Sequence, residues 1–236
     1  MRFTRKAMLM TIVFDLDGTL VDTAPDLIAT LNLILAREGM PPVDYEAARR
    51  MIGGGARGMI ERALAAEGRN CAKSEIDRMF AAFIEHYAAH IADRSRPFPQ
   101  LEEALELLAG EGHRLAVCTN KLEWLSVRLL DTLNLSRHFA AICGQDTFKV
   151  QKPDPKILQL TIERVGGEPS RAIMVGDSGT DIRTSRAASV PVIAVNFGYS
   201  EEPIATLLPD RIIGSFADLT SAIRDIEADR SVRSGL

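Results

Sequence analysis

The stretch that decides the fold of this chain is Thr11-Ile12-Val13-Phe14-Asp15-Leu16-Asp17-Gly18-Thr19, near the N-terminus. Its first four residues are β-branched or apolar, which is typical of a short buried strand. Two aspartates then follow, one residue apart, at the end of that strand. Carboxylates in such a place are costly unless a cation or hydrogen-bond donors compensate their charge. The stretch therefore predicts a strand whose end carries a charged site.

The composition is that of an ordinary globular protein. The chain has 236 residues, 46% of them hydrophobic and 25% charged, which is enough for a core domain with a smaller partner. Its net charge of −4 argues against nucleic-acid binding, and no apolar run approaches the roughly 18 residues of a membrane span. Three scattered cysteines argue against a disulfide framework and favour a cytoplasmic protein, which we expect to be a monomer or homodimer.

The N-terminal segment is basic, but its short apolar run leads into the aspartates without a cleavage site. We therefore expect no signal peptide. Met1, Met8 and Met10 are all candidates for the true start.

Strand and helix signals alternate over most of the chain. After the first strand at 11–14, further strands are expected at 114–118, 141–143, 173–175, 192–195 and 212–213. Helices are expected near 101–109, 124–133, 155–165, 181–188 and 216–228, and the polar tail at 229–236 is expected to fray. Strands separated by helices predict an α/β fold with a doubly wound, mostly parallel sheet, a Rossmann-like core.

A purely helical block interrupts this alternation directly after the first strand. Between residues 25 and 93, apolar residues recur at helical spacing, with breaks at Gly39, at 53–55 and at Gly68. Ser74 and Asp77 predict a capping box at the start of a fourth helix that runs towards residue 93. We therefore predict a catalytic core of residues 1–22 and 94–236, with an α-helical cap of residues 23–93. Such an insert lies over the carboxyl ends of the strands, where open α/β sheets bind ligands, and can act as a lid.

Four motifs at or soon after strand ends carry the candidate chemistry. They are Asp15-Leu16-Asp17-Gly18-Thr19, Thr119-Asn120, Lys152-Pro153 and Gly176-Asp177-Ser178-Gly179-Thr180-Asp181. Because strand ends converge in a doubly wound sheet, these motifs can share one pocket. Carboxylates at that density repel one another unless a cation is present, and oxygen-only ligands suit magnesium better than zinc. The motifs therefore predict a Mg²⁺ site.

Taken together and in this order, the motifs resemble those of the haloacid dehalogenase superfamily of phosphatases, over about residues 11–225. Within it, the phosphoglycolate phosphatase branch is the most similar, on the stretches Gly198-Tyr199, Pro209-Asp210-Arg211-Ile212-Ile213 and Phe216-Ala217-Asp218-Leu219. The resemblance implies a magnesium-dependent hydrolase of a small phosphate ester, with 2-phosphoglycolate as the expected substrate.

The resemblance also implies a role for each motif. Asp15 would attack phosphorus and form an aspartyl-phosphate, and Asp17 would protonate the leaving oxygen and then activate water. Lys152 would neutralise charge on Asp15 and on the phosphoryl group. The implied substrate-binding residues in these motifs are Thr19, Thr119 and Asn120. The implied metal ligands are Asp15, the backbone carbonyl of Asp17, Asp177 and, directly or through water, Asp181.

Three further features of the sequence carry weaker signals, and the first of them has two interpretations. The stretch Gly53-Gly54-Gly55-Ala56-Arg57 is either a plain loop or a loop that the lid lowers onto the substrate, where Arg57 pairs with a carboxylate. It lacks the Gly-Lys-Ser/Thr of a nucleotide-binding P-loop. His86 and His90 share a helix face but lack the glutamate of a zinc-protease motif. Ser189 stands where the family usually has a glycine after a helix.

Rival functions share the same core. A dehalogenase lacks the second aspartate, so Asp17 argues against it, and a phosphonate hydrolase needs a lysine in the lid, where Lys73 is poorly placed. A sugar phosphomutase, a pyrophosphatase and a nucleotidase stay open. A phospho-acceptor receiver module also uses an acidic cluster, magnesium, a threonine and a lysine, but it is smaller and lacks both the lid and the second aspartate.

Overall fold

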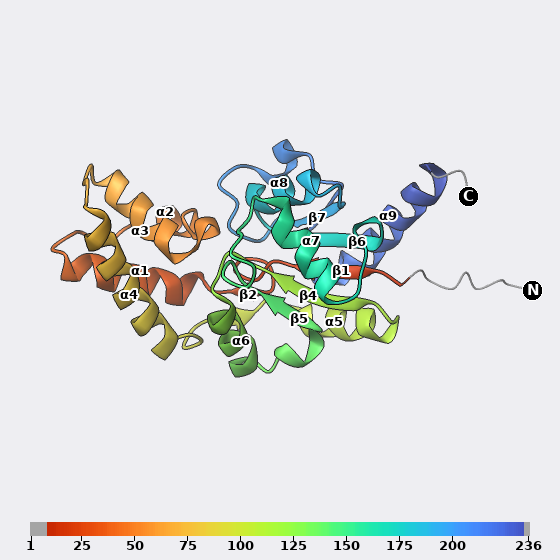
Figure 1. Ribbon diagram of the computed structural model, residues 1–236, viewed down its shortest axis with the longest axis horizontal. Coiled ribbons are helices and arrows are strands. Elements are labelled where there is room, and N and C mark those ends of the chain that lie inside the picture. Colours follow the sequence, from red (N-terminus) through yellow and green to blue (C-terminus); the bar gives the residue numbers. More distant parts are fainter. Residues whose placement is uncertain (1–8, 234–236) are drawn as a thin grey trace, which may run out of the picture.

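A six-stranded parallel sheet forms the centre of the computed structural model, which describes residues 9–233 (Figure 1). Its order is β5-β4-β1-β6-β7-β8. The strands are β1 (Thr11–Phe14), β4 (Arg114–Cys118), β5 (Ala141–Cys143), β6 (Ala172–Gly176), β7 (Val192–Val195) and β8 (Arg211–Ile213). At the centre of the sheet, Phe14 lies level with Val117 of β4 and Val175 of β6, so three strands end together. This arrangement confirms the predicted doubly wound sheet.

Helices cover both faces of the sheet because side chains alternate along each strand. Ile12 and Phe14 belong to one buried apolar cluster and Val13 to the other. The first cluster is completed by α5 (Leu101–Gly110) and α9 (Leu219–Arg233), and the second by α7 (Pro155–Arg164) and α8 (Gly179–Ala187). The helix α6 (Glu123–Thr132) packs against β5. Short 3-10 turns lie at Ile52–Gly54, Ser136–His138, Pro169–Arg171, Ile204–Leu207 and Phe216–Asp218.

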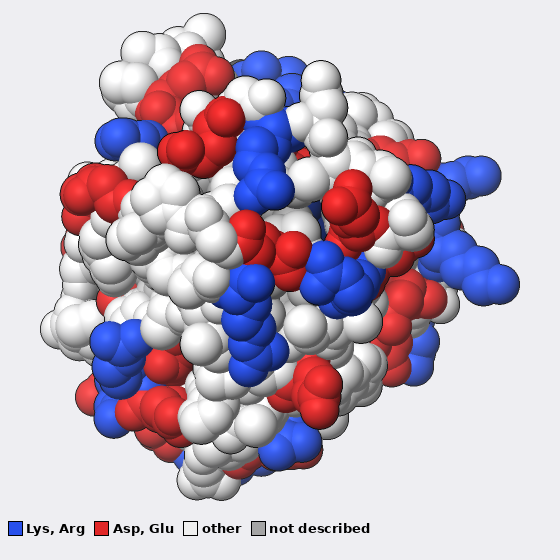
Figure 2. Space-filling view, turned by 90° about the vertical axis from the view of Figure 1, so that its left-hand side faces the viewer, with Lys and Arg blue, Asp and Glu red and all other residues white. Residues whose placement is uncertain are grey.

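The helices of the predicted cap gather at one end of the molecule, beyond the carboxyl ends of the strands (Figure 1). They are α1 (Ala24–Arg37), α2 (Tyr45–Arg49), α3 (Gly55–Ala66) and α4 (Lys73–Ala89). On the face that this end presents, acidic and basic side chains are interspersed and form no broad basic patch (Figure 2). The position of these helices suits a lid, while the division into two domains stays a prediction.

The joint between the helical end and the sheet consists of two chain segments that run side by side. The strands β2 (Val21–Asp22) and β3 (Arg96–Pro97) pair in antiparallel fashion. Next to them, the buried carboxylate of Asp26 accepts hydrogen bonds from the backbone N–H groups of Arg94 and Ser95 and from the Ser95 hydroxyl, at 2.6 to 3.1 Å. The start of α1 is thereby fixed to the segment that returns from α4.

Some predicted helix boundaries differ from the structure. Helix α4 begins at Lys73, so the capping box predicted for Ser74 and Asp77 is wrong. The Glu75 side chain instead accepts a hydrogen bond from the backbone N–H of Ala72 at 2.8 Å, which satisfies a donor at the true helix start.

Near the end of the chain, residues 229–233, the described part of the tail expected to fray, are helical. Helix α9 continues to residue 233, because Asp229 pairs with Arg211 of β8 at 2.6 Å and ties this turn to the sheet. Residues 1–8 and 234–236, which include the candidate starts Met1 and Met8, lie outside the described residues.

Three further observations bear on the sequence analysis. No helix among residues 9–233 is both long enough and apolar enough to cross a membrane. The three cysteines are free thiols. Ser189, directly after α8, has a φ of 56°, the left-handed conformation in which glycine is the usual residue.

Candidate active site

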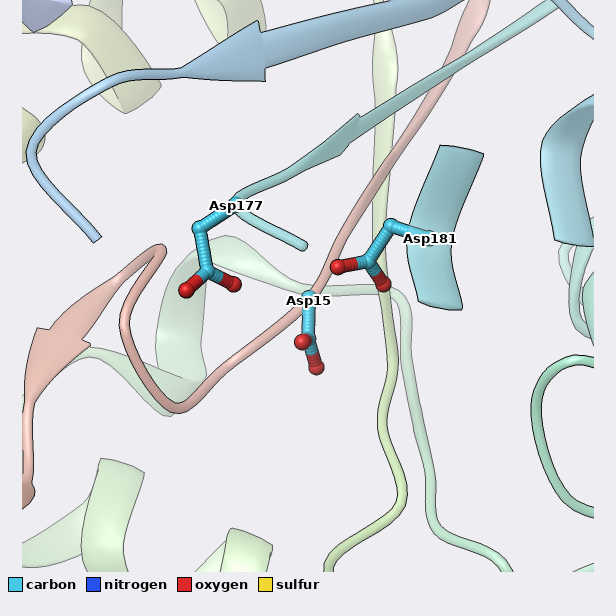
Figure 3. Close-up of side chains that lie close together, drawn as sticks. All are labelled: Asp15, Asp177 and Asp181. Atoms are coloured by element: carbon cyan, nitrogen blue, oxygen red, sulfur yellow. The ribbon is translucent and has the colours of Figure 1, made fainter. Parts of the chain in front are cut away.

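Three aspartates meet where β1 and β6 end (Figure 3). Asp15 follows β1, Asp177 follows β6, and Asp181 lies in the first turn of α8. One carboxylate oxygen of each lies within 4.8 Å of the others, and the residues are only 9%, 2% and 0% exposed. The structure thus brings together three residues that are up to 166 positions apart in the sequence, as the convergence of strand ends predicts.

One buried lysine supplies positive charge to this cluster. Nζ of Lys152 lies 2.9 Å from Oδ1 of Asp15 and 2.6 Å from Oδ1 of Asp181. Burial nevertheless raises the pKa of Asp15 to about 6, because desolvation and the charge of Asp181 outweigh the attraction of Lys152. Burial also raises the pKa of Asp177 well above its ordinary value, with Asp181 and Asp15 adding repulsion.

The donor set fits a magnesium ion. Three carboxylates beside a single ammonium leave an excess of negative charge, which a divalent cation would balance. The available ligand atoms are all oxygens, which Mg²⁺ prefers. We therefore regard this cluster as the candidate metal site.

Two glycine-containing loops close around Asp177. The hydroxyl of Thr19 donates to Oδ1 of Asp177 at 3.1 Å, and the backbone N–H of Tyr199 donates to Oδ2 at 2.6 Å. A Cβ at Gly18 or at Gly198 would collide with the Asp177 side chain. Thr19, which the sequence predicts to bind substrate, is fully buried and holds this carboxylate in place.

The carboxylate of Asp17 does not join the cluster but pairs with Lys121. Nζ of Lys121 lies 2.8 Å from Oδ1 and 3.1 Å from Oδ2 of Asp17, and the two side chains are 5% and 15% exposed. The same ammonium lies 4.6 Å from the ring centroid of Tyr87 in α4. Burial opposes the charged form, but the attraction of Asp17 prevails and raises the pKa of Lys121. The sequence analysis missed Lys121, although a cation directly after Thr119-Asn120 at a strand end was a usable signal.

Thr119 and Asn120 lie beside Lys152 after β4. The Asn120 side chain accepts a hydrogen bond from the backbone N–H of Lys152 at 2.8 Å and donates to its carbonyl at 3.1 Å. The buried hydroxyl of Thr119 accepts one from the backbone N–H of Lys121 at 3.2 Å. These two side chains thereby hold the backbone of both lysines of the site.

Two polar cavities open between the helical end and this site. One, of about 350 Å³, is lined by Arg50, Lys152 and Ser178 among others, and the second, of about 370 Å³, reaches Asp177. Their linings share Arg50, Tyr199, Ser200, Glu201 and Glu202. A substrate at the carboxylate cluster therefore has room for a short polar substituent.

Arg57, which the sequence predicts to reach the substrate, lies outside both cavities. Its Nη2 lies 2.7 Å from Oδ1 of Asp77, and its guanidinium stacks on Phe80 at 4.8 Å from the ring centroid. Both partners belong to α4, so the Arg57 side chain braces α3 against α4.

Comparison with known proteins gives concordant matches. The family described as haloacid dehalogenase-like hydrolase matches residues 12–195. A phosphoglycolate phosphatase of Mesorhizobium japonicum is 48% identical over 223 residues, covering 94% of this chain and 96% of that protein. One of Agrobacterium fabrum is 48% identical over 211 residues, covering 89% and 91%. The crystal structure of a predicted phosphoglycolate phosphatase from Haemophilus somnus has a TM-score of 0.85 and 30% identity, covering 90% of this chain and 97% of that one.

Proposed function

The chain belongs to the haloacid dehalogenase-like hydrolases, in the phosphoglycolate phosphatase branch, and we propose that it is a magnesium-dependent phosphatase that converts 2-phosphoglycolate to glycolate and phosphate. The observation that carries this proposal is the cluster of Asp15, Asp177 and Asp181, with Lys152 in contact with Asp15 and Asp181. The names of the relatives support the choice of substrate.

Asp15 is the proposed nucleophile. Its Oδ1 is held by the backbone N–H of Leu16 at 2.7 Å and by Lys152 at 2.9 Å, whereas Oδ2 accepts no hydrogen bond from the described residues. Oδ2 is therefore the oxygen that we expect to attack phosphorus. The Oδ2–P bond forms while the bond from phosphorus to the glycolate oxygen breaks, which leaves an aspartyl-phosphate. Water then attacks the same phosphorus and releases phosphate and the free carboxylate.

Asp17 is the proposed proton carrier of both steps. It would donate a proton to the departing glycolate oxygen and then take one from the attacking water. The contact with Lys121 fixes the direction of the Asp17 carboxylate before substrate binds. Lys152, Thr119 and Asn120 are the residues that we expect beside the phosphoryl oxygens.

Magnesium, when bound, would neutralise phosphoryl charge and orient the phosphorus towards Asp15. Its proposed ligands are Asp15, Asp177 and the backbone carbonyl of Asp17. Both oxygens of Asp181 already have partners, Oδ1 in Lys152 at 2.6 Å and Oδ2 in the Ser178 hydroxyl at 2.7 Å. We therefore propose that Asp181 reaches the metal through water, and that Thr19 positions Asp177.

A steady-state panel of small phosphate esters, with EDTA or with added Mg²⁺, tests this proposal. We expect 2-phosphoglycolate to have the highest kcat/KM, above sugar phosphates, nucleoside monophosphates and pyrophosphate, and EDTA to abolish phosphate release. Asp15→Asn should lower kcat by at least about 1,000-fold with an unchanged circular dichroism spectrum. Release of no more than one phosphate per protein would indicate a receiver-type module instead.

A further inference from the structure

Within residues 9–233, the guanidinium of Arg50 has no partner, although Arg50 lines two cavities together with Glu201 and Glu202. Among the described residues, no hydrogen bond or ion pair joins the Arg50 side chain to any neighbour, and the residue is exposed. Its neighbours in the helical end are all engaged: Arg49 with the carbonyls of Phe197 and Gly198, Arg62 with the carbonyl of Met51, and Arg57 with Asp77. An unpaired arginine is thus available for a ligand.

Arg50 also stands where a substrate would extend. It is the C-cap residue directly after α2, and it lines both the cavity that contains Lys152 and the cavity that contains Asp177. Lys152 and Asp177 flank the point at which the proposed function places the phosphoryl group. The part of the substrate beyond the phosphoryl group can therefore extend into the space beside Arg50.

We propose that Arg50 binds the carboxylate of the substrate and so determines the preference for a phosphate ester that carries a second anionic group. This inference rests on the proposed function, because it takes the phosphoryl position as given. A guanidinium can hold a carboxylate through two parallel N–H···O bonds, which makes the contact strong and directional. Arg57, which the sequence predicts to bind the substrate carboxylate, already forms an ion pair with Asp77.

Two other features of the cavity supply rival interpretations. Arg183 lines it from α8, but its guanidinium donates to the Thr180 hydroxyl at 3.4 Å, and it lines only one of the two cavities. Glu201 and Glu202 line both, so Arg50 could instead pair with them when the helical end moves against the sheet. A latch of that kind would affect every substrate equally, whereas a carboxylate contact affects only substrates that carry one.

The test compares 2-phosphoglycolate with ethylene glycol monophosphate, which has a hydroxymethyl group in place of the carboxylate. For Arg50→Ala we expect kcat/KM on 2-phosphoglycolate to fall about 10- to 100-fold, mainly through KM, and on the neutral analogue less than about 3-fold. Arg50→Lys should restore part of the loss, since it keeps the charge but not the paired geometry. Arg69→Ala is the matched control, because Arg69 donates to the carbonyl of Glu38 and lines neither cavity.

Any other result of these measurements contradicts either the role of Arg50 or the proposed function. Equal losses on both substrates for Arg50→Ala would overturn the proposal in favour of a latch. A selective loss for Arg57→Ala or Arg183→Ala, with Arg50→Ala unaffected, would move the contact to that arginine. If the unaltered protein hydrolyses neither compound, the proposed function fails; if it hydrolyses both and Arg50→Ala changes neither rate, only this inference fails.

Discussion

Asp15 and Asp17, with only Leu16 between them in the chain, lie in different electrostatic environments. Asp15 is buried among carboxylates and shares Lys152 with Asp181, whereas Asp17 has Lys121 to itself. A separation of environments is what allows two nearby carboxylates to perform different tasks in one reaction. In the proposed mechanism Asp15 acts as nucleophile and Asp17 as proton carrier. Lys152 contacts the first and Lys121 the second, so each carboxylate has its own electrostatic environment.

Replacement of Lys121 tests this division of labour. Lys121→Met keeps the length and the packing on Tyr87 but removes the ammonium that contacts both oxygens of Asp17, so we expect kcat to fall about 10- to 100-fold with KM changed less than about 3-fold. Lys121→Arg, which retains two donors, should recover most of kcat. Steady-state kinetics on 2-phosphoglycolate measures both. Equal kcat for Lys121→Met and the unaltered protein, or a loss seen only in KM, would contradict the assignment.

At the residue scale, the sequence is a good guide to which groups come together in the site. It is a poorer guide to the direction in which a long side chain points. Asp15 and Asp177 directly follow strands and Lys152 lies in the connection between β5 and α7, and the topology brings such positions together. The direction of Arg57 depends on Asp77, which lies on a neighbouring helix, and no local pattern encodes that contact. Arg50 carries no motif at all, so only its unpaired state in the folded chain draws attention to it.

At the scale of elements, the loops after β1 and β7 matter because they enclose one carboxylate. Gly18 has a φ of 84°, and a Cβ there would meet Asp177 and lie 2.7 Å from the Tyr199 ring. Strand bounds such as Val192–Val195 follow from runs of β-branched residues and were predicted correctly. The two-residue strands β2 and β3 were not predicted, since so short a segment has no periodicity to detect.

Gly18→Ala should therefore disturb the site far more than an ordinary loop substitution. We expect the free energy of unfolding to fall by about 2–4 kcal/mol and Mg²⁺-dependent activity to fall at least about 100-fold, since Asp177 must move. Gly68→Ala is the matched control: its φ is 64°, but a Cβ there has nothing within 4 Å. That variant should lose only about 1 kcal/mol and keep its activity. Urea unfolding and a Mg²⁺ titration measure both effects. Similar losses in the two variants would show that the loop at Gly18 does not hold Asp177 in place.

At the scale of the whole molecule, the buried cluster links stability to pH. The folded state binds protons at Asp15 and Asp177 more tightly than the unfolded chain does, because burial raises both pKa values. For Asp15 the associated stability is fully present below the unfolded pKa of 3.8 and is lost as the pH rises through about 6, and the raised pKa of Asp177 acts in the same direction. Without a metal, Asp15 and Asp177 should therefore make the protein less stable near neutrality than in mild acid.

Metal removal makes this dependence measurable. In EDTA, we expect Asp177→Asn to raise Tm relative to the unaltered protein at about pH 7.5 by several degrees, and by less at about pH 5, because the variant removes a carboxylate whose charged form is disfavoured by burial and by the neighbouring carboxylates. Added Mg²⁺ should raise the Tm of the unaltered protein at about pH 7.5 and leave that of Asp177→Asn nearly unchanged. Thermal melts at both pH values provide the measurement. The same Mg²⁺ response in both proteins would show that Asp177 does not bind the ion.

The paired strands β2 and β3 have a consequence for the ancestry of the protein. Val21 lies opposite Pro97, so the chain departs for the helical end and comes back at neighbouring points, about 5 Å apart at the backbone. The segment between these two points, residues 22–96, can therefore be exchanged by recombination without changing the order or direction of any strand of the six-stranded sheet. If Arg50 selects the substrate as proposed, the chemistry and the choice of substrate can be inherited separately, one with the sheet and the other with the helical segment.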